Sequence, residues 1–383
     1  MRSTGSRRIA IASATGSQLV RQDLPFIQAL INKGHKVLCF TPEISEIEWH
    51  TLLANGAAVE QLDLVADRWA LMPNRQVATR VMKSLSEWSA DTVIARGGEL
   101  LAAVVDGARR AKVPRIIPVV DWSVAPADAD QNDADARDEV DDDAPDYLGR
   151  AFDLPTVHLC YNHDHAARLE YSGLLCEGAS TVVLPNTGVD LETFPCKPLP
   201  RMGGTLTFLM ISDMRQSNGV LDFCKAARLV LEESPNTEFI LAGAVSEAED
   251  AVALRTLAEF RGVVEYAGDA KEPAELIERC HVFVYPVHGI GLAFDALPAL
   301  AMGRPLVVSD APGCRDLVDE RVNGCFAEAG NELSLADAMA SYLKRPELIP
   351  SMARASRHKA ERRFDRRLSM AALFELIGLE QTA

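Results

Sequence analysis

The sequence lacks several features that would place it in common classes of protein. Its eight cysteines include no Cys-x-x-Cys pair, so neither a disulfide framework nor a zinc site is indicated, and we expect reduced cysteines in the cytoplasm. No apolar stretch approaches the about 18 residues that cross a bilayer, and the apolar run at residues 9–14 is too short for a signal peptide. Positive charge is scarce, and the net charge of −16 argues against binding to nucleic acid.

The acidic excess is concentrated in one segment, where ten acidic residues and one basic residue lie between Asp128 and Asp146. Four side chains match positions 1, 3, 5 and 12 of a calcium-binding loop, namely Asp128, Asp130, Asn132 and Glu139. Position 6 of such a loop is glycine, but here it is Asp133, and flanking amphipathic helices are missing. We therefore interpret residues 125–147 as a solvated acidic insert and expect no metal site.

Strand-like and helix-like patterns alternate along residues 9–184, and the alternation restarts at residue 206. A proline-rich stretch at residues 185–200 separates the two halves and is typical of a linker. The pattern predicts two doubly wound, Rossmann-like α/β domains, with a ligand cleft between them at the carboxyl ends of the strands. We assign residues 1–195 and 196–355 to these domains and residues 356–383 to a C-terminal helical segment.

Small or polar residues follow three predicted strands of the N-terminal half. Gly16 and Ser17 come after the first strand, Arg96 follows the strand at residues 92–95, and Asp121 follows the strand at residues 115–120. Because such positions face the cleft of a doubly wound fold, we expect the first three residues to contact a substrate. Asp121 is our candidate catalytic residue, although a local role in capping its own loop is an equally good interpretation.

Loops that contain glycine follow three predicted strands of the C-terminal half, after residues 211, 285 and 309. Loops of this kind leave backbone N–H groups free at helix N-termini, where they can bind a diphosphate. The residues that we expect at this site are Arg215, Asn218, Gly219, Gly289, Ile290, Gly291, Asp295 and Gly313.

Residues 281–327 resemble the donor-sugar half of the GT-B glycosyltransferases, especially glycosyltransferase family four, also called group 1. The resemblance is carried by Tyr285-Pro286, by the run from Ala301 to Pro305 and by Pro312-Gly313. It implies a GT-B fold, in which two Rossmann-like domains face a cleft. The family places an arginine and a lysine on the diphosphate and two glutamates on the sugar and the ribose. The corresponding positions here are Asp213, Asn218, Ile290 and Pro298.

These four departures leave the function open. The resemblance implies a transferase that moves a sugar from a UDP-sugar or GDP-sugar to a saccharide, lipid-linked or small-molecule acceptor. It also implies retention at the anomeric carbon and no metal or other cofactor. Gly16, Ser17 and Arg96 would then contact the acceptor, and Arg215 would substitute for the missing cations. A second interpretation is a catalytically degenerate protein that binds or scaffolds in glycan assembly. A nucleotide-sugar epimerase of GT-B type is a third.

The last predicted helix, at residues 351–376, is rich in basic residues. They are Arg354, Arg357, Lys359, Arg362, Arg363, Arg366 and Arg367. The resemblance implies that a C-terminal helix crosses back onto the N-terminal domain, with Phe364 as its anchor. An alternative is peripheral contact with an anionic membrane, at the inner face of the cytoplasmic membrane where lipid-linked acceptors reside.

Overall fold

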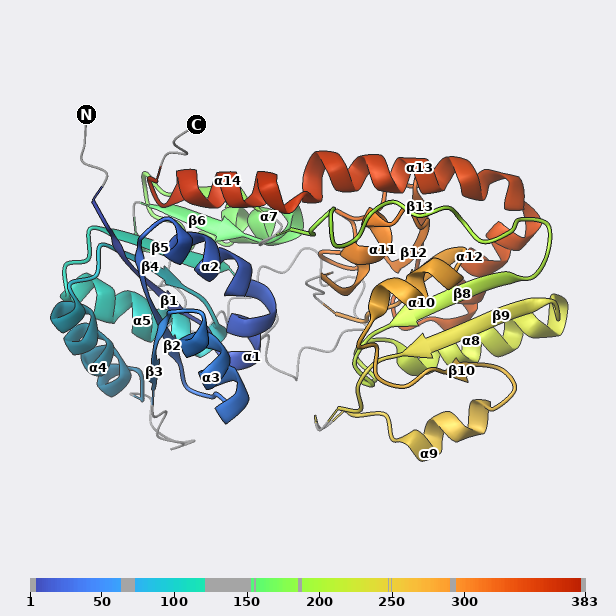
Figure 1. Ribbon diagram of the computed structural model, residues 1–383, viewed down its shortest axis with the longest axis horizontal. Helices are drawn as coiled ribbons and strands as arrows, with labels where there is room; N and C mark the ends of the chain where they lie inside the picture. Colours follow the sequence, from blue (N-terminus) through green and yellow to red (C-terminus); the bar gives the residue numbers. More distant parts are fainter. Residues whose placement is uncertain are drawn as a thin grey trace. The chain divides into compact units, whose positions relative to one another are not determined.

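The structure is a computed structural model that describes residues 5–379, except 63–72, 121–152, 155, 185–187, 247, 249 and 290–293. The chain divides into two units, which are described separately (Figure 1). Unit 1 comprises Met1–Thr187 and Ser369–Ala383, and unit 2 comprises Gly188–Leu368. The acidic insert, with its calcium-loop positions, lies outside the described residues.

The described part of unit 1 forms a parallel sheet of seven strands in the order β3-β2-β1-β4-β5-β6-β7. The strands are β1 Arg8–Ala12, β2 Lys36–Thr41, β3 Ala58–Gln61, β4 Thr92–Ala95, β5 Arg115–Val120, β6 Val157–Cys160 and β7 Ser180–Val183. Its helices are α1 Gly16–Gln18, the π-helix η1 Leu19–Asp23, α2 Leu24–Asn32, α3 Glu46–Ala54, α4 Pro73–Trp88, α5 Gly98–Arg110 and α7 His163–Tyr171.

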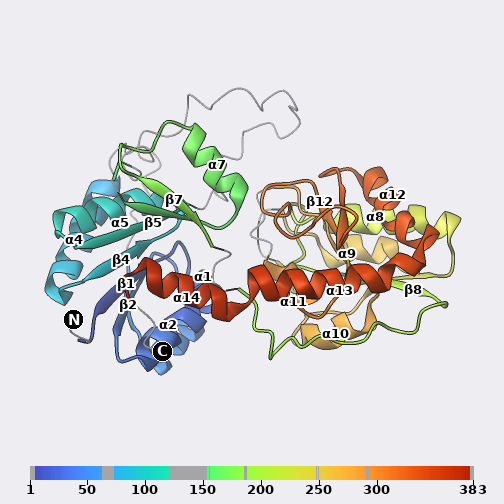
Figure 2. The same cartoon turned by 90° about the horizontal axis from the view of Figure 1, so that it is seen from above.

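The central strands of the unit 1 sheet are buried along most of their length, and alternate residues of a strand pack against opposite faces. Ala10 of β1 and Phe40 of β2 join a core cluster with Val81 of α4 and Val104 of α5. Helices α4 and α5 therefore cover one face of the sheet, while α2 lies on the other (Figure 2). Continuous apolar strands of this kind are expected where helices cover both faces of a parallel sheet.

The described part of unit 2 forms a second parallel sheet, of six strands in the order β10-β9-β8-β11-β12-β13. The strands are β8 Leu206–Ile211, β9 Thr237–Ala242, β10 Glu265–Tyr266, β11 Val282–Tyr285, β12 Leu306–Ser309 and β13 Gly324–Ala327. Its helices are α8 Val220–Glu233, α9 Leu254–Leu257, η2 Ala258–Phe260, α10 Pro273–Arg279, η3 Phe294–Ala296, α11 Leu297–Ala301, α12 Glu332–Lys344, η4 Pro346–Leu348, α13 Ile349–Lys359 and the π-helix η5 Ala360–Phe364.

One predicted helix of unit 2 is wrong. The sequence pattern predicts a helix over residues 247–260, but among the described residues of that range only Leu254–Leu257 are α-helical, as α9. Ala251 instead forms a β-bridge with Arg215, and the Val252 N–H donates to the Met214 carbonyl at 2.8 Å. The segment is held extended because its backbone pairs with the loop after β8, which satisfies donors that a helix would otherwise satisfy internally.

The C-terminal segment returns to unit 1 through α14, Arg366–Leu376. The single predicted helix at residues 351–376 is interrupted, because η5 and the extended residue Asp365 separate α13 from α14. Phe364 does not anchor the segment on unit 1: it is buried in a cluster of unit 2 that includes Val189. The contact with unit 1 is made by Phe374, whose ring centroid lies 5.7 Å from that of Phe26 on α2.

Candidate functional site

Each sheet reverses its strand order at one place, between β1 and β4 in unit 1 and between β8 and β11 in unit 2. In open parallel sheets the loops at the carboxyl ends of two such strands diverge, and the crevice between them is the usual place for a ligand. We call these places the unit 1 switch point, with loops 13–17 and 96–97, and the unit 2 switch point, with loops 212–219 and 286–289.

Gly219 closes the two loops of the unit 2 switch point onto each other. Its φ of +76° lies in the left-handed region, and a Cβ added to it would lie 1.9 Å from the carbonyl oxygen of Pro286. Only glycine fits this backbone and this approach. The same loops are joined again by the His288 N–H, which donates to the Ser217 carbonyl at 2.9 Å.

Arg215 is tied to the loop that follows β9. Its Nε donates to Oδ1 of Asp250 at 2.8 Å, and the Ser217 N–H donates to the other carboxylate oxygen at 3.0 Å. Although burial opposes ionisation, hydrogen bonds from Ser217 and Arg215 hold the pKa of Asp250 down at about 2. The Arg215 side chain is 43% exposed, so its guanidinium borders solvent while Nε is fixed.

Asn218 forms a hydrogen bond within its own loop. Its side-chain amide donates to the Asp213 carbonyl at 3.0 Å, which braces the turn before Gly219. The resemblance places a lysine here, and the structure gives the shorter amide a backbone partner in its own loop. Asn218 thus shapes the loop that carries Arg215 and the start of α8.

His288 and Asp222 form a pair that the sequence did not reveal. Asp222 lies in the first turn of α8, is largely buried, and its carboxylate contacts Nε2 of His288. In the sequence, Asp222 is typical of an acidic residue that favours a helix N-terminus, and His288 is one residue of a glycine loop. His288 lies three residues after the end of β11, and neither residue has a local sequence pattern that predicts the contact.

The other described residues that we expect at the donor site lie after β11 and β12. An added Cβ at Gly289 would meet no described atom within 4 Å, and Gly313 has a φ of +84° in the loop after β12. Asp295 is exposed in η3, and its charge adds to burial in raising the pKa of Tyr285. Pro298 lies in the first turn of α11. Ile290 and Gly291 lie outside the described residues.

At the unit 1 switch point, the loops are closed by backbone contacts. The Gly16 N–H donates to the Glu43 carbonyl at 2.6 Å, and a Cβ on Gly16 would lie 2.6 Å from Cγ1 of Ile44. Gly97, with a φ of +100°, approaches Ala14 so closely that an added Cβ would lie 2.8 Å from its backbone nitrogen. Ser17 is partly exposed on α1.

Arg96 is buried rather than open to solvent. Its two terminal nitrogens bind the two carboxylate oxygens of Asp23, each at 2.9 Å, and both side chains are less than 5% exposed. Burial raises the pKa of Asp23, while the charge of Arg96 opposes that rise. A substrate would have to compete with this bidentate pair for Arg96, so the geometry favours a structural part for it. Asp121 lies outside the described residues.

Neither a cluster of metal ligands nor a membrane-spanning helix is present among the described residues. Within the described ranges, no three His, Cys, Asp or Glu side chains are grouped so that they could hold a metal ion. None of the helices in the part of the chain that the structure describes has the length and the apolar character needed to span a membrane.

Residues 205–345 match the family described as "Glycosyl transferases group 1". Among curated proteins, N,N'-diacetylbacillosaminyl-diphospho-undecaprenol alpha-1,3-N-acetylgalactosaminyltransferase of Campylobacter jejuni is 28% identical over 146 residues, 38% of each chain. Phosphatidyl-myo-inositol mannosyltransferase of Mycobacterium leprae is 27% identical over 196 residues, 49% of this chain and 50% of that one. The matches therefore span half or less of the length of these relatives.

Solved structures resemble the chain over nearly its whole length. A glycosyltransferase from Rickettsia africae has a TM-score of 0.75 at 12% identity, covering 97% of this chain and 98% of that one. HepE from Anabaena, in complex with UDP and glucose, has a TM-score of 0.70 at 16% identity, covering 96% of this chain and 98% of that one. The chain therefore has the GT-B fold. Within that fold, the match to the group 1 glycosyl transferase family extends over residues 205–345, from β8 to α12.

Proposed function

We propose that the protein is a glycosyltransferase that moves a sugar from a nucleoside-diphosphate sugar to a glycan or lipid-linked acceptor. The observation that carries the proposal is a coincidence of position: the group 1 match at residues 205–345 contains both loops of the unit 2 switch point. HepE, which shares the fold, has been solved in complex with UDP and with UDP-glucose. The lipid-linked class of acceptor is suggested by the Campylobacter relative, whose name includes a diphospho-undecaprenol.

The donor would lie at the unit 2 switch point. Its diphosphate would meet the backbone at the start of α8, which Gly219 leaves without a side-chain cap. Arg215, fixed through Nε, would direct its terminal nitrogens at a phosphate oxygen, an arrangement that suits arginine because its fork is rigid. Retention at the anomeric carbon and reaction without a metal remain parts of the proposal, as does the choice of UDP or GDP.

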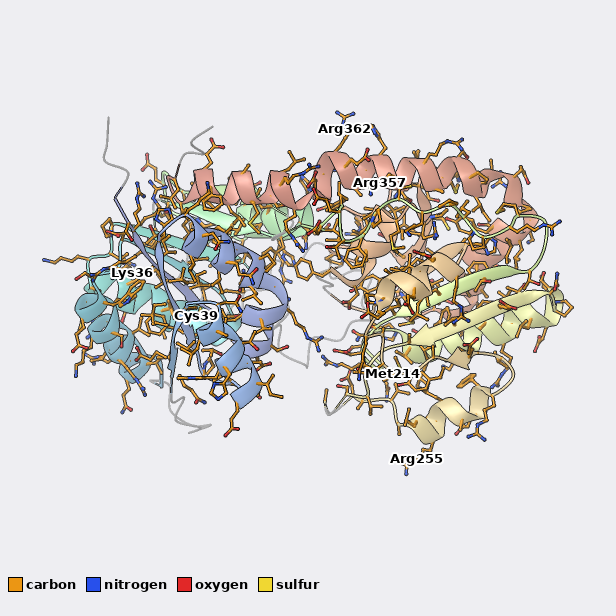
Figure 3. All side chains as sticks on the ribbon, viewed as in Figure 1. Lys36, Cys39, Met214, Arg255, Arg357 and Arg362 are labelled. Atoms are coloured by element: carbon orange, nitrogen blue, oxygen red, sulfur yellow. The ribbon has the colours of Figure 1, made fainter. Side chains whose placement is uncertain are left out.

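Nucleotide-sugar binding is tested by thermal shift against UDP-glucose, ADP-glucose and GDP-mannose. We expect one of them to raise Tm, because a ligand that binds only the folded protein stabilises it. Arg215→Gln should reduce that rise, whereas Arg255→Gln, an exposed arginine on α9 of the same unit (Figure 3), should leave it unchanged. No rise with any donor, or an equal rise in both variants, would count against the proposed site.

A degenerate binding protein is the second candidate, favoured by two described positions. Pro298 has no side-chain hydrogen-bond acceptor, and Asn218 is bound to its own loop. Thermal stabilisation by a nucleotide-sugar, without release of the nucleoside diphosphate in the presence of polyprenyl-diphosphate sugars or oligosaccharides, would select this candidate over the enzyme.

Peripheral membrane contact through the basic segment at residues 354–367 is also part of the proposal, but fewer cations are left to make it than the sequence suggests. Four of its seven cations have acidic partners: Arg357 pairs with Glu361, Lys359 with Asp319, Arg366 with Asp190 and Arg367 with Asp365. The exposed cations that remain are Arg354, Arg362 and Arg363, and Arg362 points outward from α13 and η5 in Figure 3.

Three exposed arginines would give weak attraction, because each contributes about 1 kcal/mol near an anionic surface. Co-sedimentation with phosphatidylglycerol vesicles should therefore fall at least tenfold when all three are changed to glutamine. Binding that is equal in the triple variant and the parent would contradict this contact.

A further inference from the structure

The His288–Asp222 pair lies where the proposed donor would place its phosphates. The His288 backbone is joined to loop 212–219 through Ser217, and its ring contacts Asp222 in the first turn of α8. The His288 side chain is 30% exposed, against 11% for Asp222, so the ring lies between a buried carboxylate and solvent. The pair therefore borders the start of α8, beside the turn that ends at Gly219.

The contact with Asp222 determines what the other ring nitrogen can do. An ionised carboxylate only accepts hydrogen bonds, so Nε2 must carry a proton in order to bind it. In a neutral imidazole, Nδ1 then has no proton and can only accept. The oxygens of a diphosphate are also acceptors. Nδ1 can therefore bind a phosphate oxygen only when the ring is protonated on both nitrogens.

Asp222 also makes a cation acceptable at this position. The N-terminus of a helix carries a partial positive charge, which disfavours a protonated imidazole beside it. The carboxylate of Asp222, contributed by the same helix turn, offsets that effect. Several other charged groups lie near this loop. Asp213 and Arg215 belong to loop 212–219, and Asp250 binds both Arg215 and the Ser217 N–H. Asp295 lies further along the segment that carries His288.

We propose that His288, oriented by Asp222, donates a hydrogen bond from Nδ1 to the diphosphate of the donor, so that donor binding takes up a proton. This inference rests on the proposed function and specifies it: the protonated imidazole supplies a cation that the position of Asn218 does not. Binding is then strongest at low pH and weakens as pH rises, because the competent form of the ring is lost.

The test is calorimetric titration with UDP-glucose, ADP-glucose and GDP-mannose between pH 6 and pH 8. Nucleotide-sugars are required because the terminal phosphate of a free nucleoside diphosphate has its own second pKa near 6, whereas an esterified diphosphate has none in this range. Repeating each titration in two buffers with different heats of ionisation measures the protons taken up. For the parent protein we expect proton uptake near pH 7 and an affinity that falls by up to tenfold per pH unit above the midpoint.

Three variants separate the possible roles. His288→Asn should lower affinity at pH 6 by about tenfold or more, the size of a hydrogen bond to a charged group, and should abolish proton uptake. Asp222→Asn keeps a hydrogen-bond acceptor but removes the charge, so the midpoint of the pH profile should move to lower pH. His358→Asn, which changes an exposed histidine of α13, should match the parent protein at every pH.

The outcomes distinguish this inference from the proposed function. If a nucleotide-sugar binds with an affinity that does not vary between pH 6 and pH 8, or if His288→Asn retains the parent profile, the inference is wrong and the donor site stands. If none of the three donors binds at any pH, the proposed function fails, and this inference fails with it.

Discussion

The two switch points share one topology but differ in how far their arginine–aspartate pairs are exposed to solvent. Each has an arginine paired with an aspartate and a glycine that lets one loop approach the other. In unit 1, Arg96 follows β4 and is buried against Asp23. In unit 2, Arg215 follows β8, is 43% exposed, and binds Asp250 through Nε. The unit 1 pair is therefore closed off from solvent, while the unit 2 pair borders solvent, where the proposed donor would meet it.

The largest loss of stability is expected when the buried Arg96–Asp23 pair is broken. Arg96→Met should reduce the free energy of unfolding of unit 1 by about 3–5 kcal/mol, because Asp23 would be left buried without its partner. All four tryptophans lie in unit 1, at positions 49, 69, 88 and 122, so tryptophan fluorescence during denaturation reports on this unit. The double variant Arg96→Met with Asp23→Leu should recover much of the loss. A loss below 1 kcal/mol would remove the distinction between the two pairs.

A smaller effect is expected at the glycine contact of unit 2. Gly219→Ala should destabilise unit 2 by about 2–4 kcal/mol, because the left-handed backbone is strained for alanine and its Cβ would overlap the Pro286 carbonyl. Gly97→Ala in unit 1 should reduce stability by less, because the added Cβ would lie 2.8 Å from its nearest neighbour, the backbone nitrogen of Ala14. Circular dichroism and calorimetry measure both. Equal stability of Gly219→Ala and the parent would contradict the described loop contact.

The smallest effect on stability is expected at the exposed pair. Arg215→Met should cost less than about 1 kcal/mol at pH 7, because solvent screens exposed ion pairs. The folded pKa of Asp250, about 2, lies below its ordinary value of 3.8, so the contribution of the pair is present above pH 4 and is lost as pH falls toward 2. The difference in free energy of unfolding between variant and parent, measured by urea denaturation, should therefore shrink as pH falls from 4 toward 2. A difference that grows instead would refute the assigned ion pair.

Much of the fold could be predicted from the sequence because burial and local signals agree there. The strands at Thr92–Ala95 and Arg115–Val120 have the predicted bounds, and β8, β11 and β12 end at the predicted residues, since each is an apolar run that stops at turn residues. The helix at Glu46–Ala54 begins at Ser45, which forms a capping box with Glu48. The GT-B fold predicted from the resemblance is confirmed by the solved structures.

The misses share a physical cause, which is contact between residues distant in the sequence. The helix predicted over residues 247–260 is replaced by pairing with the loop after β8. Arg96 could not be distinguished from a substrate contact without Asp23, 73 residues away. The His288–Asp222 pair spans 66 residues and leaves no local pattern. The roles assigned to the donor and acceptor residues therefore stay predictions, including that of Asp121.

The most direct test of the contrast between the units is hydrogen exchange measured by mass spectrometry, with and without the nucleotide-sugar that gives the largest thermal shift. We expect the donor to slow amide exchange in loops 212–219 and 286–289 of unit 2 and to leave exchange in loops 13–17 and 96–97 of unit 1 unchanged. Slowed exchange confined to the unit 1 loops, with unit 2 unaffected, would contradict it.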